Sequence, residues 1–114
     1  MMMTLRYRFA GTMKLGVGEV VMAFEVIEYR EPTPEPGRAF EGTHERVLGT
    51  FEIEADAISK GREAWRSARA SETSDVMWWI VRVPGESLCR WIADRGNDQE
   101  QILDLTTNSL VPVR

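Results

Sequence analysis

The sequence has very little cysteine and histidine, and this scarcity excludes several kinds of site. It contains one cysteine, Cys89, and one histidine, His44, among 114 residues. A single cysteine cannot form an internal disulfide, which fits a reducing cytoplasm. Structural zinc sites use four cysteine or histidine ligands. We therefore predict no metal site and no cofactor.

Long apolar runs and an excess of positive charge are also missing. No run approaches the roughly 20 apolar residues that cross a bilayer, and no N-terminal stretch has the pattern of a secretory signal. The net charge is −4, whereas nucleic-acid-binding proteins usually carry a basic patch. We therefore predict a soluble, cytoplasmic protein that does not enter the membrane, and nucleic acid is disfavoured as a partner.

The first 21 residues allow two interpretations. Glu19-Val20 is compatible with the codons GAG-GTN, and GAGG is the core of a bacterial ribosome-binding site lying just before Met22. Met22 would then be the native start, and residues 1–21 would be a translated leader. The alternative is an N-terminal hairpin, because apolar and polar residues alternate early in this stretch and glycines follow. Residues 22–114 are predicted to form a single domain.

The hydrophobic pattern of that domain predicts one helix and several strands. Strands are expected at residues 22–29, 46–53, 76–83, 88–94, 101–107 and 110–113. The helix is expected at 54–70, with acidic residues in its first turn and arginines in its last. The order β-β-α-β-β-β predicts an α+β fold: an antiparallel meander sheet of five to six strands with one helix packed on one face.

Within the expected helix, Ile58, Gly61, Trp65 and Ala68 form a narrow stripe that should face the sheet. Glycine costs a helix about 1 kcal/mol relative to alanine. Its position in the stripe therefore predicts a close approach of helix and sheet at Gly61.

The adjacent tryptophans Trp78 and Trp79 are the most informative feature of the strand at 76–83. Side chains alternate along a strand, so the two rings must point to opposite faces of the sheet. The strand is apolar on both sides, so both faces need cover. One helix, about 10 Å wide, covers about two strands of one face. The other face could be covered by the proline-rich loop at 31–45, by a second copy, or by a different partner or ligand.

A short turn at 84–87 suggests how the tryptophan strand pairs with the next one. With Val83 opposite Leu88, Trp79 faces Ile92 and Ile80 faces Trp91. This register predicts that Trp79 lies in the core under the helix. The partner-binding face would then carry Trp78, Ile80, Arg82 and Trp91. A shift by one residue would regroup these residues but leave both faces apolar.

Few residues offer chemistry. His44, near Glu41 and Glu45, could act as a general base, but a solvated loop histidine is the simpler interpretation. Cys89 is expected to be a small buried hydrophobe. The acidic residues at 94–104 lack the spacing of a calcium-binding loop, so no metal is predicted there.

The predicted helix carries one row of arginines. Arg62, Arg66 and Arg69 lie at i, i+4 and i+7 and form a candidate anion-binding stripe. A solvated helix face is the alternative interpretation.

These observations predict a small non-catalytic interaction module that binds itself or a protein partner through its tryptophan-bearing sheet face. One alternative is a small enzyme or ligand-binding protein that uses His44 and nearby carboxylates. A second alternative is a single-stranded nucleic-acid binder, because tryptophans alternate with Arg82 and Arg90 near the hairpin.

Overall fold

A computed structural model describes residues 7–8, 11–12, 23–39 and 42–113. The elements are β1 (Tyr7–Arg8), β2 (Gly11–Thr12), β3 (Phe24–Glu31), β4 (His44–Phe51), α1 (Glu54–Ala70), β5 (Val76–Arg82), β6 (Trp91–Asp94), β7 (Gln101–Asp104) and β8 (Ser109–Pro112). β1 and β2 pair as a short antiparallel ladder. Apart from that ladder, the stretch interpreted as a leader or a hairpin lies outside the described residues, so its origin stays a prediction.

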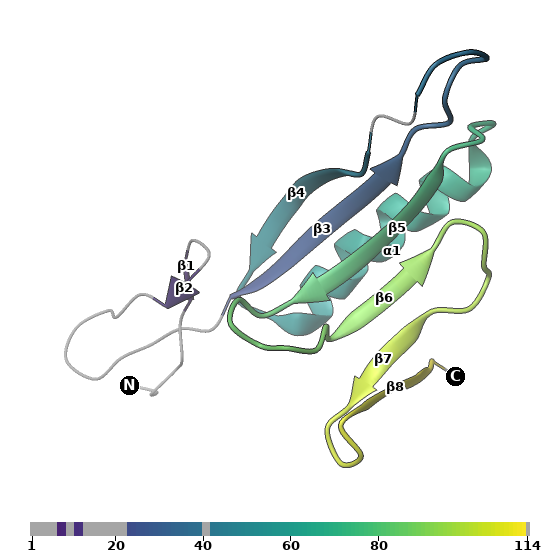
Figure 1. Cartoon of the computed structure of the whole chain (residues 1–114). Helices are drawn as coiled ribbons and strands as arrows, with labels where there is room; N and C mark the ends of the chain where they lie inside the picture. The colour runs from purple at the N-terminus through teal and green to yellow at the C-terminus, as the bar shows by residue number, and fades with distance from the viewer. Residues whose placement is uncertain (1–6, 9–10, 13–22, 40–41, 114) are drawn as a thin grey trace.

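The main sheet confirms the predicted fold class. It has six antiparallel strands in the order β4-β3-β5-β6-β7-β8, and α1 packs on one face (Figure 1). From β5 onwards, consecutive strands are neighbours, as in a meander. β4 and β5 instead lie on either side of β3 and are both antiparallel to it. They therefore run parallel to each other, and such strands need a long crossover connection, which α1 provides.

The helix has the predicted bounds and approaches the sheet closely at Gly61. A β-carbon built on Gly61 would lie 2.6 Å from Cζ3 of Trp91. Ala57, Ile58, Gly61 and Trp65 are its buried residues. α1 contacts β3, β4, β5 and β6 rather than the two strands expected. Large side chains widen its contact: Trp65, for example, packs edge-to-face on Trp91 with ring centroids 6.4 Å apart.

The core lies between α1 and this face of the sheet, and strand alternation supplies its residues. Val26, Trp79, Val81 and Trp91 are fully buried there. Leu48, Phe51 and Ile102 pack against this cluster from the neighbouring strands. Apolar side chains of every second residue thus form one continuous core.

The predicted register of β5 with β6 is wrong by one residue. Trp79 lies opposite Ala93, Ile80 opposite Ile92, and Val81 opposite Trp91. The backbone N–H of Arg90 also bonds to the carbonyl of Val81, at 2.7 Å. Both Arg90 and Trp91 therefore lie opposite Val81, whereas the prediction placed only Arg90 there. The extra residue turns Trp91 onto the helix side.

The proline-rich loop after β3 extends past the ends of the strands (Figure 1). Its start is held by Asp75, which accepts a hydrogen bond from the backbone N–H of Thr33 at 2.8 Å and pairs with Arg30 at 2.6 Å. The described part of this loop therefore does not cover the second face of the sheet. No helix of the described residues is long and apolar enough to cross a bilayer.

Candidate interaction surface

The sheet face turned away from α1, here called the far face, carries an apolar row that crosses the sheet. Directly opposed residues on successive strands form this central row: Val47, Ile27, Ile80, Ile92, Gln101 and Pro112. Directly opposed residues share a face of the sheet, and alternation from the buried Val26, Trp79, Val81 and Trp91 sets this row on the side away from α1. The first four members are aliphatic, so the row is a continuous apolar band over β4, β3, β5 and β6.

Two rows with polar groups flank the band. On one side, Thr50, Glu25 and Arg82 are cross-strand partners. Glu25 is only 7% exposed, and its carboxylate pairs with Nε of Arg82 at 3.0 Å. A nearly buried carboxylate needs such a partner, because an unpaired charge there would be costly.

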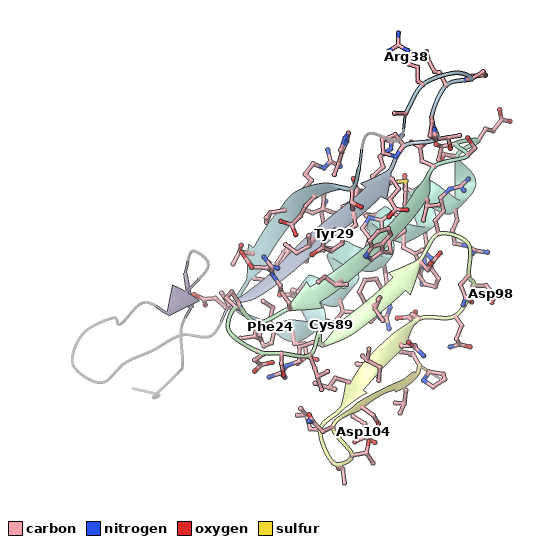
Figure 2. The ribbon with its side chains drawn as sticks, viewed as in Figure 1. Phe24, Tyr29, Arg38, Cys89, Asp98 and Asp104 are labelled. Atoms are coloured by element: carbon pink, nitrogen blue, oxygen red, sulfur yellow. The ribbon has the colours of Figure 1, made fainter. Side chains whose placement is uncertain are left out.

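On the other side of the band, Glu45, Tyr29, Trp78 and Asp94 are cross-strand partners. The rings of Tyr29 and Trp78 stack with centroids 5.2 Å apart and planes inclined by 14°. Burial and the Glu45 carboxylate raise the pKa of the Tyr29 phenol, and Arg82 opposes this shift. Figure 2 shows Tyr29 over the middle of the sheet, on the side facing the viewer.

The far face is partly covered by its own side chains. Ile27 is fully buried although α1 lies on the other side of the sheet. Trp78, Ile80 and Ile92 are half-buried, and Val47 is 51% exposed. The aromatic stack and the Glu25–Arg82 pair thus flank Ile27 and leave the outer parts of the band open to solvent.

Three of the four predicted partner-binding residues lie on the far face: Trp78, Ile80 and Arg82. Trp91 does not, because the register shift buries it completely under α1. Its indole N–H donates to the Glu100 carboxylate at 2.8 Å. This corrects the predicted surface by removing one tryptophan.

Sequence reasoning missed Tyr29, Val47 and Ile92 as members of this surface. The alternation at 22–29 does set Ile27 and Tyr29 on one side of their strand. It does not reveal that β3 lies next to β5, because β4 and the helix separate them along the chain. That neighbour relation is what brings Tyr29 onto Trp78.

The predicted anion-binding stripe on the helix is largely engaged within the chain. Nε of Arg62 pairs with Glu100 at 2.6 Å. Arg69 donates to the backbone carbonyls of Arg95 and Asn97. Arg66 is exposed. Two of the three arginines therefore hold α1 against the β6–β7 connection, and this arrangement does not favour a shared anion site.

The arginines considered for nucleic-acid binding also fail to gather on one side. Arg82 lies on the far face, whereas the helix arginines lie on the other side of the sheet. Arg90 pairs with Glu86 at 2.8 Å and with Glu54 at 3.3 Å. A stacking platform with a basic groove is therefore not favoured by this geometry.

The residues considered for chemistry are not assembled into a reactive group. His44 is exposed at the start of β4 and lies opposite Arg30. Within the described part of the chain, its ring makes no hydrogen bond or ion pair with a carboxylate. Glu45 belongs to the far face, and Glu41 lies outside the described residues. Burial raises the pKa of the half-buried Cys89 thiol, which disfavours the reactive thiolate.

Residues 23–39 and 42–113 contain no group of three or more histidine, cysteine, aspartate or glutamate side chains positioned to hold a metal ion. Comparison with protein-family models, curated proteins and solved structures finds no match to this chain. Its function must therefore be argued from its own surfaces.

Proposed function

We propose that this chain is a small non-catalytic interaction domain that forms a homodimer through the far face of its sheet. The observation that supports the proposal is the apolar band over β4, β3, β5 and β6 together with half-buried Trp78 in the row beside it. Neither α1 nor the described part of the proline-rich loop lies over this face (Figure 1). Apolar side chains that stay open to solvent on a sheet face commonly mark an interaction surface.

A second copy suits this face because the two flanking rows are complementary. A two-fold axis running along the central row would stack each band on its copy. It would also bring the row with Arg82 against the row with Trp78 and Asp94. Arg82 could then lie on an indole face beside a carboxylate, an arrangement that is favourable for a guanidinium. Two-fold dimers are the commonest soluble oligomers.

The size of the face predicts a weak dimer. Strands about 4.8 Å apart with an average length of about 20 Å give a flat area of roughly 500 Å² across the six-stranded sheet. A standard interface contributes about 800 Å² per partner. The proposed dimer interface is therefore small among specific protein interfaces. We expect a dissociation constant on the order of micromolar.

Light scattering of the purified chain over a range of concentrations tests the proposal. The mass should rise from the 13.0 kDa of one chain toward twice that value. Trp78→Ser should weaken dimerisation at least about tenfold, since central aromatic residues dominate interface energies. Leu105→Ser is the matched control, because Leu105 is 69% exposed at the β7–β8 turn and lies off the band. A monomer at every concentration, or equal loss in both variants, would contradict the dimer.

We also propose a bacterial cytoplasm as the location of this domain. The chain has a single cysteine, whose thiol pKa is raised, so it forms no internal disulfide that would require an oxidising compartment. The codons compatible with Glu19-Val20 fit a bacterial ribosome-binding site. Fractionation of the native cells with an antibody against the chain tests this proposal, and recovery from the medium or the envelope would contradict it.

A further inference from the structure

A second surface feature lies on the helix side of the sheet, away from the far face. A groove of about 430 Å³ runs between the C-terminal half of α1 and strands β3 and β4. Its helical wall carries Ala64, Ser67 and Ala68, which are too small to fill the space above β4. Leu48 and Met77 contribute apolar surface from the sheet. The groove has the size of small-molecule sites, which span about 300–1,000 Å³.

Cationic side chains line this groove in a chain that is acidic overall. Arg30, Arg46 and Lys60 contribute to its walls, against one carboxylate, Glu28, while the chain has a net charge of −4. Two carboxylates outside the groove lining also pair with these cations: Asp75 with Arg30 at 2.6 Å, and the exposed Glu63 with Lys60 at 3.3 Å. The Arg46 side chain is 70% exposed and that of Lys60 is 38% exposed, so both stay accessible to a ligand from solvent. These two cations approach the groove from β4 and from α1, which are its opposite walls.

The Glu28 carboxylate is already engaged with groups of the protein. It accepts a hydrogen bond from the indole N–H of Trp79 at 3.0 Å and pairs with Arg46 at 3.1 Å. Its charge is therefore compensated, and it holds Arg46 at the wall of the groove. A guanidinium carries five N–H donors, so the contact with Glu28 leaves Arg46 able to bind a second anion.

We propose that this groove binds an amphiphilic anion, with the apolar body on Leu48, Ala64 and Met77 and the carboxylate or phosphate group between Arg46 and Lys60. Ligand sites usually combine apolar contact surface with a small number of placed polar groups. In this groove the apolar side chains share the lining with charged residues and with three hydroxyl side chains: Ser67, Ser71 and Thr73. The groove lies on the opposite side of the sheet from the dimer face, so this proposal does not rest on the proposed function.

Titration of the whole chain with four probes tests the chemistry of the ligand. Octanoate and octyl phosphate carry both an apolar body and an anionic group. Octanol lacks the charge, and inorganic phosphate lacks the apolar body. We expect saturable binding of one or both amphiphilic anions, with shifts of the methyl resonances of Ala64, Ala68 and Met77. Octanol and inorganic phosphate should bind at least about tenfold more weakly. Octanol makes no charge-assisted hydrogen bonds, and inorganic phosphate buries no apolar surface.

Variants distinguish this groove from nonspecific binding. The double variant Arg46→Gln with Lys60→Gln should weaken the binding of both amphiphilic anions at least about tenfold. It should leave the binding of octanol unchanged, because only charge-assisted hydrogen bonds are lost. Ala64→Phe should fill the groove and weaken every apolar probe. Arg66→Gln is the matched control, since Arg66 is exposed on the same helix and does not line the groove.

Three outcomes would overturn the proposal. One is the absence of saturable binding of both amphiphilic anions, and another is methyl shifts confined to residues outside the groove. The third is equal weakening by Arg66→Gln and by the double variant. Light scattering of the same variants keeps the two proposals separate, because changes in the groove should leave the dimer mass unchanged.

Discussion

Two adjacent tryptophans in β5 have different surroundings on the two faces of one sheet. Trp79 is fully buried under α1, and its indole N–H donates to Glu28 at 3.0 Å. Trp78 is half-buried on the far face and stacks on Tyr29. The two side chains are identical and adjacent in sequence. The comparison therefore shows that the element packed on each face decides how deeply a residue is buried.

The covered face also satisfies the polar atoms of its large aromatic residues. The indole N–H of Trp65 donates to the carbonyl of Asp94 at 2.8 Å, and that of Trp91 donates to Glu100 at 2.8 Å. Together with Trp79, the three buried tryptophans between α1 and the sheet thus each have a hydrogen-bond acceptor for the indole N–H. Buried tryptophans need such acceptors, because an unsatisfied donor in the core is costly.

The largest expected effect separates the two tryptophans of β5. Trp79→Ala should lower the free energy of unfolding by about 3–5 kcal/mol, because it opens a cavity under α1. Trp78→Ala should lower it by about 1–2 kcal/mol, since it removes a half-buried ring and one stack. Urea unfolding followed by circular dichroism, at concentrations where the chain is monomeric, measures both. An equal loss of unfolding free energy in the two variants would show that the two faces do not differ in how they stabilise the fold.

The next effect probes how tightly the covered face is packed. A β-carbon on Gly61 would lie 2.6 Å from the buried ring of Trp91. Gly61→Ala should therefore destabilise the fold by about 1–2 kcal/mol, because overpacking outweighs the gain of about 1 kcal/mol in helix propensity. Thermal unfolding measures the change.

Ser67→Ala is the control for that substitution, because Ser67 is exposed on the same helix. It should change the stability by less than about 0.5 kcal/mol. A stabilised Gly61→Ala variant would show that helix and sheet have room to separate at this point.

The smallest effect concerns the far face. Burial and Glu45 raise the pKa of Tyr29 above its ordinary value of 10.0. A raised pKa means that the folded state favours the neutral phenol. This contribution to stability is present below pH 10 and is lost as pH rises through the folded-state pKa.

Denaturant unfolding of the wild type and of Tyr29→Phe, from about pH 9 to about pH 11, tests this contribution. The wild type should lose more stability than the variant over that range, because phenylalanine has no phenol to ionise. Parallel curves for the two proteins would show that Tyr29 is as solvated as in an unfolded chain.

Local patterns of the sequence were enough to predict most of the fold. The helix at 54–70 follows from its charged ends and its apolar stripe, and its observed bounds agree. Gly61 in that stripe predicted the close approach to the sheet, which Trp91 confirms. These features depend on neighbours along the chain, so the sequence carries them directly.

The candidate surface was predicted only in part. The alternation of β5 set Trp78, Ile80 and Arg82 on one face, and the structure agrees. The pairing with β6 depended on the path of the chain after Val83, where the extra residue at Arg90 shifts the register. Because the side-chain period of a strand is two, this single residue was enough to move Trp91 to the other face.

The sequence by itself determined that β5 is apolar on both sides, since alternation is a property of the strand alone. Only the tertiary structure decided that Trp91 joins Trp79 under α1, that β3 is the neighbour of β5, and that Tyr29 therefore stacks on Trp78. It also decided where small helix residues leave a groove beside Arg46 and Lys60. The physical reason is that these contacts join residues far apart in sequence, whose relative positions depend on register and packing across the whole sheet.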